Sequence, residues 1–350
     1  MPSRGPESDV RGVASAPSRR PRLLTGDRPT GPLHLGHYVG TLTNRVRLQD
    51  THDTYILVAD HHMLTSRLDR LGEVEANIRE DVLGNLSAGL DPHRATIYLQ
   101  SRVPETAELF LYFAMLVSVA RAQRIPTLKE KLSESGIALP SYGLLGYPIL
   151  QAADILLLGA DVVPVGDDQQ SHIELAREIA RGFNGRFGRV FRLPSALRPN
   201  TGTLPGTDGS PKMSRSIGNT IDLFDEPETV RRKVLSMYTD PRRLRVTDPG
   251  RVEGNPVFAY HEAFNPDPGE VADLEQRYAA GRVGDVEVKE RLIVALNAFL
   301  EPIRERRRAI LEESSSIVED VLQAGTARAR LEARETMARV RSAMGIDYFE

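Results

Sequence analysis

Residues 22–37 have the sequence RLLTGDRPTGPLHLGH, which combines a strand pattern, a loop rich in Gly and Pro and the start of a helical pattern. Its first residues, Arg22 to Thr25, predict a short strand, which the loop rich in Gly and Pro that follows would end. A helical pattern begins near Leu35 and continues to Gln49. A strand that leads through a tight loop into a helix is the opening unit of an α/β domain.

The same alternation of strand and helix continues downstream. Residues 54–59, TYILVA, form an apolar run typical of a strand buried on both faces of a parallel sheet. Helical patterns at 71–86 and 105–122 separate further strand patterns at 96–99 and 162–165. We therefore expect a doubly wound, Rossmann-like parallel-sheet α/β domain over residues 23–222 and a mainly helical C-terminal domain over residues 223–350. In the amphipathic segment 286–344, Pro302 is expected to end or kink a helix.

Composition sets limits on the function. The chain has 350 residues, 40% of them hydrophobic, and a net charge of −3, which suits a globular protein and gives no sign of a DNA-binding one. It has no Cys, which excludes disulfides, cysteine metal sites and a cysteine nucleophile. No apolar run is long enough to span a membrane. Residues 1–22 lack the apolar core of a secretory signal. We expect them to be a disordered tail on a cytoplasmic protein that binds neither membrane nor DNA.

The segment HxGH at residues 34–37 is the sharpest chemical signal. It lies between a strand and a helix, where ligands bind in open α/β sheets. Gly36 would let a nucleotide approach the backbone closely, and the helix start favours phosphate. His34 and His37 would then donate hydrogen bonds to charge that develops in a transition state. The alternative, that both are ordinary loop or cap residues, is equally favoured by this segment alone.

A second signal, KMSRS at residues 212–216, follows the polar run PGTDGSP at 205–211. A mobile loop carrying Lys212 could close over a triphosphate and offset the charge of a leaving pyrophosphate. Taken alone, the segment is more typical of a solvated basic loop.

The two segments together resemble the paired signature of class I aminoacyl-tRNA synthetases, and the resemblance runs from about Leu23 to the end of the chain. A third stretch narrows it. Residues 143–157, GLLGYPILQAADILL, and residues 162–175, VVPVGDDQQSHIEL, are similar to sequences of the tryptophanyl-tRNA synthetases.

The resemblance implies a function and its partners. The expected function is ATP-dependent activation of L-tryptophan to tryptophanyl-adenylate, followed by transfer to tRNA(Trp). The implied cofactors are ATP and Mg²⁺, with the ion held by the ATP phosphates and not by protein ligands. The family also implies a homodimer in which the domain at 223–350 binds the tRNA anticodon.

The resemblance also implies site residues. The catalytic set is His34, His37, Lys212, Arg215 and Lys131. The ATP-binding set is Arg28, Pro29, Thr30, Gly36, His37, Gly166, Asp167, Asp168, Lys212, Met213, Ser214, Arg215 and Ser216. The tryptophan-binding set is Asp154, Tyr147, Gln151, His62, Val163, Val165 and Gln169.

Asp154 lies in an otherwise apolar helical pattern, so its carboxylate is either paired within the protein or available to a ligand donor. The indole N–H is only a donor, which makes a buried carboxylate its natural partner. The residues alone favour the internal pair, whereas the resemblance implies the contact with indole.

Some positions depart from the family pattern and leave alternatives open. Gln151 stands where many tryptophan enzymes have Met, and Arg215 replaces the usual Lys, which binds phosphate differently. The pattern of Tyr147, Gln151 and Asp154 also resembles that of the tyrosyl-tRNA synthetases. Those enzymes, however, have a tyrosine on the first strand that helps bind the phenol hydroxyl, and Leu24, which stands in its place, cannot form a hydrogen bond. The alternatives are a tyrosyl-tRNA synthetase and a paralogue that binds tryptophan in an auxiliary or regulatory role. Basic residues near 231–233 and 242–245 could contact tRNA phosphates or could equally form a solvated helix face.

Overall fold

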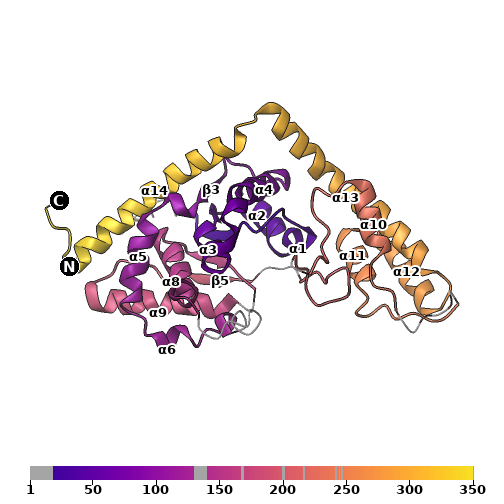
Figure 1. Cartoon of the computed structure of the whole chain (residues 1–350), viewed down its shortest axis with the longest axis horizontal. Coiled ribbons are helices and arrows are strands. Elements are labelled where there is room, and N and C mark those ends of the chain that lie inside the picture. The colour runs from indigo at the N-terminus through magenta and orange to yellow at the C-terminus, as the bar shows by residue number, and fades with distance from the viewer. Residues whose placement is uncertain are drawn as a thin grey trace, which may run out of the picture.

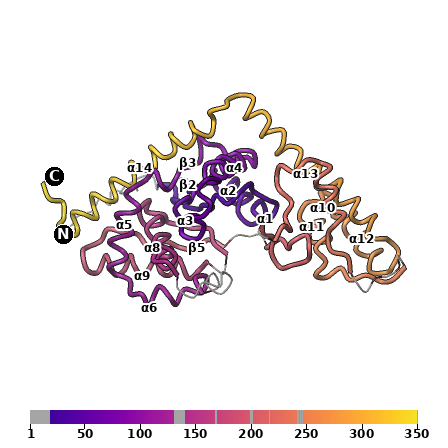
Figure 2. Tube along the Cα trace, viewed as in Figure 1, coloured from indigo at the N-terminus to yellow at the C-terminus, as the bar shows by residue number. Residues whose placement is uncertain are grey.

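The computed structural model describes residues 19–129, 140–166, 169–198, 202–215, 217–240, 243, 245 and 247–349. The chain forms an α/β lobe and a helical lobe (Figure 1). Two long helices, Asp285–Glu313 and Ile317–Met344, form an arch over both lobes (Figure 2). Within the described residues, no helix is both long enough and apolar enough to cross a membrane.

The α/β lobe is built on one parallel sheet. Its strands are β1 (Arg22–Asp27), β2 (Asp53–Val58), β3 (Ala95–Leu99), β4 (Val162–Pro164) and β5 (Ser195–Leu197). Their spatial order is β3-β2-β1-β4-β5, and every pairing is parallel. The predicted doubly wound fold is confirmed, although the sequence pattern did not predict β5. The order of strands reverses at β1, which has β2 on one side and β4 on the other.

Both faces of the sheet are covered. On β2, Tyr55 and Leu57 pack into one apolar cluster, while Ile56 and Val58 pack into another. The first cluster takes side chains from α5 (Glu105–Ala114), α8 (Tyr142–Leu157) and α9 (Gln170–Phe187), and the second from α4 (Val74–Ser87). This explains why residues 54–59 are apolar without alternation. The remaining elements of this lobe are α3 (Asp60–Arg67), η2 (Leu68–Glu73), η3 (Gln100–Arg102) and α6 (Val119–Ala122).

The helix predicted at 35–49 is one helical segment made of α1 (Leu35–His37), the π-turn η1 (Tyr38–Leu42) and α2 (Thr43–Leu48). The hydroxyl of Thr41 donates to the carbonyl of His37 at 2.9 Å, and that of Thr43 donates to the carbonyl of Tyr38 at 2.9 Å. Single π-turns inside helices are common at functional sites.

The helical lobe contains α10 (Pro227–Leu235), α11 (Pro256–Phe264), α12 (Pro268–Ala279) and α13 (Asp285–Glu313). Its apolar core also includes Leu33, Leu35 and Leu42 from the segment after β1, so the two lobes share one core. We expected Pro302 to end or kink a helix. It does not end one, because α13 continues from Asp285 to Glu313 with Pro302 inside it. Burial of Leu300 and Ile303 on either side of the proline keeps this turn helical.

The last helix, α14 (Ile317–Met344), returns to the α/β lobe and covers β3, the edge strand of the sheet. Its contact is very close, because a Cβ added at Gly325 would lie 1.9 Å from the carbonyl oxygen of Ile97. One backbone amide of β3 also has a partner on the helix, since the amide of Leu99 donates to the hydroxyl of Thr326 at 3.2 Å. The helix thus protects an edge that could otherwise pair with another chain. The division of the chain at residue 223 stays a prediction.

We predict that Gly325→Ala destabilises the protein by at least about 2 kcal/mol, because the new methyl group would overlap the backbone of β3. The matched control is Gly182→Ala, in the exposed part of α9, where an added Cβ meets no atom within 4 Å. This control should be neutral or more stable by about 0.5–1 kcal/mol, since alanine favours helix. Urea unfolding of the two variants measures the difference, and equal stabilities would contradict the close contact.

Candidate functional site

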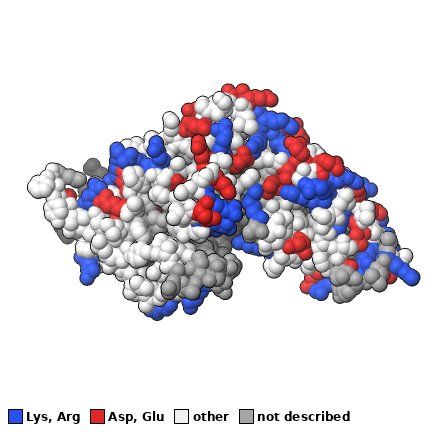
Figure 3. Space-filling model, in the orientation of Figure 1, with Lys and Arg blue, Asp and Glu red and all other residues white. Residues whose placement is uncertain are grey.

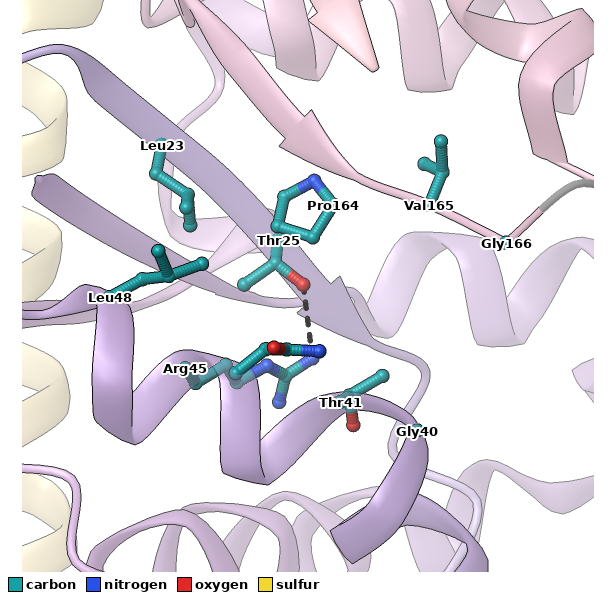
Figure 4. A pocket seen from close by; sticks show the side chains of 10 residues that line it. Leu23, Thr25, Gly40, Thr41, Arg45, Leu48, Pro164, Val165 and Gly166 are labelled. Atoms are coloured by element: carbon teal, nitrogen blue, oxygen red, sulfur yellow. Dashed lines mark hydrogen bonds between the residues drawn. The ribbon is translucent and has the colours of Figure 1, made fainter. Parts of the chain in front are cut away.

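The strand order of the sheet reverses at β1, which lies between β2 and β4. Ligands of open α/β sheets bind at such switch points. A cavity of about 50 Å³ lies there between the sheet and the η1–α2 segment (Figure 4). Its lining residues are Leu23, Thr25, Gly40, Thr41, Asn44, Arg45, Leu48, Pro164, Val165 and Gly166. A cavity of this size holds a few water molecules and no nucleoside, so it is a small recess beside the site.

The two histidines of HxGH contact each other, and both accept hydrogen bonds from backbone amides at the start of α1. His34 is the N-cap of α1, and its Nδ1 accepts from the amide of Gly36 at 3.1 Å. The Nδ1 of His37 accepts from the amide of His34 at 3.1 Å, and the two ring centroids are 3.8 Å apart. Because Nδ1 is an acceptor in both neutral rings, each carries its proton on Nε2. Both Nε2–H groups are therefore set up to donate to a ligand.

Both rings favour the neutral form. Burial, together with the nearby His37, Arg215 and Lys212, lowers the pKa of His34 to about 3. Burial also lowers the pKa of His37, although the carboxylate of Asp27 opposes this effect. At physiological pH the pair thus presents two neutral donors instead of a cation.

A buried ion pair anchors the helix that carries these histidines. Arg45 is 2% exposed, and its guanidinium donates to Asp27 at the end of β1. It also donates to Asn85 Oδ1 at 3.0 Å and to Thr25 Oγ1 at 3.2 Å. The arginine lowers the pKa of the Asp27 carboxyl against the effect of burial. No pattern in the sequence indicates this pair, because its members are 18 residues apart and carry no motif.

The KMSRS segment packs directly on HxGH. Met213 is buried, and a Cβ added at Gly36 would lie 3.2 Å from its sulfur and 3.0 Å from the ring of His34. The backbones also pair, because the amide of Leu35 donates to the carbonyl of Ile221 at 2.9 Å and that of Leu223 donates to the carbonyl of Leu33 at 3.0 Å. Segments far apart in the sequence therefore form one surface.

Arg215 ties KMSRS to the loop after β1. Its guanidinium donates to the carbonyl of Pro32 and to Asp222 Oδ1, the latter at 2.9 Å. A Cβ added at Gly31, where φ is +132°, would lie 3.1 Å from that guanidinium. Lys212, by contrast, is exposed.

Asn219, which the sequence analysis did not single out, holds the rest of the loop. Its Oδ1 accepts from the amide of Ser214 at 2.7 Å, and its Nδ2 donates to Asp208 at 2.9 Å and to Ser210 at 2.7 Å.

Asp154 is 3% exposed and is paired within the protein. His62 Nε2 lies 2.9 Å from its Oδ2, and Gln100 Nε2 donates to its two oxygens at 3.0 and 2.9 Å. The amide of His62 in turn donates to Gln100 Oε1 at 3.3 Å. These bonds occupy three of the roughly four acceptor positions of a carboxylate, so Oδ1 retains one for a further donor.

Tyr147 belongs to a second buried polar group, which borders the first one. Its hydroxyl lies 2.7 Å from Thr127 Oγ1, which is 2.6 Å from His172 Nε2. The rings of Tyr147 and His62 meet edge to face with centroids 6.4 Å apart. Gln100 and Thr127 were missed by the sequence analysis. Gln100 directly follows β3, so the rule that ligands bind at carboxyl ends of strands could have found it.

The remaining predicted residues differ in their burial. Pro29 and Val163 are buried, Arg28 and Thr30 are exposed, and Gln151, Val165, Gly166 and Gln169 are half-buried. Lys131, Asp167, Asp168 and Ser216 lie outside the described residues. In the part of the chain that is described, no group of three or more His, Asp or Glu side chains could hold a metal ion.

Comparisons with known proteins show the family of the chain. The model of the family of class I tRNA synthetases for tryptophan and tyrosine matches residues 16–301. A tryptophan–tRNA ligase of Treponema pallidum is 58% identical over 93% of this chain and 97% of its own length. One of Borreliella burgdorferi is 46% identical over 94% of both chains.

Solved structures show the same relationship. Tryptophanyl-tRNA synthetase of Campylobacter jejuni, in complex with ADP and tryptophan, aligns with a TM-score of 0.80 and 33% identity over 93% of this chain and 99% of that one. A tyrosyl-tRNA synthetase of Archaeoglobus fulgidus is less similar, with a TM-score of 0.63 and 28% identity over 83% of this chain and 90% of that one. The tyrosine-specific alternative is therefore not favoured. The chain belongs to the class I tRNA synthetases and, within them, to the tryptophan–tRNA ligases.

Proposed function

We propose that HxGH at 34–37 and KMSRS at 212–216 together form the site at which this tryptophan–tRNA ligase makes tryptophanyl-adenylate. The contact between the two segments carries the proposal. Gly36 packs against both the ring of His34 and the sulfur of Met213, and backbone hydrogen bonds join residues 33–35 to residues 221–223. Two neutral donors and a set of cations thereby share one surface beside the switch point of the sheet.

The first reaction step needs positioning and charge stabilisation rather than a protein nucleophile. A carboxylate oxygen of tryptophan forms a bond to the α-phosphorus of ATP. The bond from that phosphorus to the oxygen bridging to the β-phosphate breaks, and pyrophosphate leaves with the electron pair. In the second step a terminal ribose hydroxyl of tRNA(Trp) takes the acyl group and AMP leaves. Negative charge develops on the phosphate oxygens in the first step.

The histidine pair suits this charge. The Nε2–H groups of His34 and His37 donate to phosphate oxygens, and the bonds at Nδ1 fix the rings before ATP arrives. Donors that need no reorganisation stabilise a transition state most effectively. Because both rings stay neutral, they can also release the product pyrophosphate more readily than a fixed cation would.

The basic residues Lys212 and Arg215 have different proposed roles. Lys212 is exposed and contacts the leaving pyrophosphate, whereas Arg215 positions the segment through Pro32 and Asp222. We assign the other predicted ATP contacts to Arg28, Pro29, Thr30, Gly36, Gly166, Asp167, Asp168, Met213, Ser214 and Ser216, and a further phosphate contact to Lys131. Mg²⁺ bound to the ATP phosphates would share their charge.

The pocket for tryptophan is proposed around Asp154. The indole N–H donates to the acceptor position left on Oδ1, while His62 and Gln100 keep the carboxylate in place. Phenylalanine has no donor there and would leave this position unpaired, which is the basis of strong discrimination. The other proposed contacts of the amino acid are with Tyr147, Gln151, Val163, Val165 and Gln169.

The tRNA and a second subunit complete the proposal, with the helical lobe contacting the anticodon. Arg231 pairs with Glu290, Lys233 pairs with Asp225, and the buried Arg243 pairs with Asp285, so these cations serve the fold. Figure 3 shows basic and acidic residues intermingled along the arch instead of a basic stripe.

Dimerisation is supported by exposed apolar side chains at Leu111, Met115, Val119 and Tyr142. We also propose that the enzyme acts in the cytoplasm.

We expect ATP–pyrophosphate exchange, tested with all twenty amino acids, to be driven by tryptophan alone. Lys212→Ala should lower kcat by about 100-fold and leave the KM for tryptophan unchanged, because the lost charge contacts pyrophosphate. Lys129→Ala, which removes another exposed lysine, is the control and should match the wild type. Exchange driven by tyrosine, or by no amino acid, would overturn the assignment.

Substitutions at Asp154 and Gln100 test the tryptophan pocket. Asp154→Asn should raise the KM for tryptophan by about 10–100-fold, since a charged acceptor for a buried N–H is lost. Gln100→Leu should raise it by about tenfold, because the carboxylate loses the amide that holds both of its oxygens. The KM for ATP is the internal control and should stay constant in both variants. A KM for tryptophan that remains at the wild-type value would place the indole elsewhere.

The neutral state of His34 has a consequence for stability. In the unfolded chain this histidine takes up a proton near its ordinary pKa of about 6.5, whereas the folded protein resists protonation down to a pKa of about 3. Stability is therefore lost as the pH falls below about 6.5. Between pH 7.5 and 5.5 we expect His34→Gln to lose about 1 kcal/mol less unfolding free energy than the wild type. Urea unfolding at both pH values measures this, with the exposed His93→Gln as the control variant. Identical losses for all three proteins would contradict the neutral pair.

A further inference from the structure

We propose that the groove between η3 and α14 is a second ligand site, separate from the adenylate site, and that it binds a small organic anion with a flat apolar body. The groove has a volume of about 630 Å³. This lies within the range of about 300–1,000 Å³ that is usual for small-molecule sites. Its lining residues are Leu99, Ser101, Arg102, Pro104, Glu319, Leu322, Gln323, Thr326, Ala327 and Arg330.

The apolar part of the lining comes from both walls. Leu99 and Pro104 lie on the side of the sheet, and Leu322 and Ala327 lie on α14. The polar residues Ser101, Gln323 and Thr326 are interspersed among them. Such a mixed lining suits a ligand with an aromatic body and a few polar atoms.

The charge of the groove selects an anion. Arg102 is exposed and makes no ion pair or side-chain hydrogen bond with any other described residue. Arg330 uses only its Nε on Glu105, at 3.0 and 3.3 Å, so its terminal nitrogens make no hydrogen bond within the described part of the chain. Glu105 is shared with Arg334, and Glu319 is neutralised by Arg79 at 2.9 Å. An uncompensated positive charge therefore remains, and guanidinium groups bind carboxylates, sulfonates and phosphates well.

The groove also touches the structure that holds Asp154. Arg102 and Ser101 belong to the three-residue turn η3, and the third member, Gln100, donates to both oxygens of Asp154. The amide of Ser101 donates to Asp60 Oδ1 at 3.0 Å, on the helix that carries His62. A ligand that binds the guanidinium of Arg102 would move the turn η3, and Gln100 and the Asp154 carboxylate would move with it. We therefore infer that occupancy of the groove changes the affinity for tryptophan, which rests on the proposed placement of indole at Asp154.

The site itself is tested with anilinonaphthalene sulfonate, a fluorescent aromatic anion, titrated into the full-length protein with saturating tryptophan. Arg102→Gln should weaken its binding by about tenfold, and Arg102→Gln/Arg330→Gln should weaken it further. Arg334→Gln is the matched control, because it removes a cation from the same Glu105 without altering the lining of the groove. It should bind the probe like the wild type. Equal probe affinity in the wild type and the double variant would overturn the site.

The coupling is tested by calorimetric titration. The probe should change the dissociation constant of tryptophan by about fivefold, and tryptophan should change that of the probe by the same factor, since linkage is reciprocal. Both effects should vanish in Arg102→Gln, whose pyrophosphate exchange without the probe should stay at the wild-type level. Probe binding without any effect on tryptophan would overturn the coupling.

Two further results separate this proposal from others. Asp154→Asn should lose affinity for tryptophan and still bind the probe, so failure of the tryptophan pocket is distinguishable from failure of the groove. Probe affinity that falls as the protein concentration rises would mean that a second copy of the chain covers the groove, and it would overturn the small-molecule site.

Discussion

The backbone pairing between residues 33–35 and residues 221–223 is the contact on which the site depends. Leu35 donates to Ile221, and Leu223 donates to Leu33, in a short antiparallel bridge between His34 and Asp222. This bridge holds residues 221–223, which follow KMSRS in the chain, beside the start of HxGH. It also lets Leu33 and Leu35 enter the core of the helical lobe, so the two lobes cannot separate without exposing apolar side chains.

Two buried polar groups hold the two halves of the proposed site. Under HxGH, Arg45 joins Asp27, Thr25 and Asn85. Beside the proposed tryptophan pocket, Asp154 joins His62 and Gln100. Each group places a charge in the interior, and each compensates it with hydrogen bonds, as buried charges require. Groups of this kind fix side-chain positions more sharply than apolar packing does, which suits a reaction that depends on positioning.

The helix α14 links distant parts of the protein. It covers β3 through Gly325 and Thr326, and it forms one wall of the groove whose other wall includes η3. The residue next to that wall, Gln100, reaches Asp154. The C-terminal helix, the edge of the sheet and the proposed tryptophan pocket are thus within a few hydrogen bonds of one another.

The sequence alone predicts the parallel α/β sheet, and its HxGH and KMSRS segments predict the family by resemblance. These features are local, because apolar runs and glycine-rich loops reflect the conformation and burial of the residues that contain them. Only the tertiary structure decided which partners meet. The sequence left open whether Asp154 is paired internally, and the structure supplied His62 and Gln100. It likewise showed that Pro302 does not end α13 and that α14 returns to cover β3. Such outcomes depend on contacts between residues far apart in the chain, which no local pattern encodes.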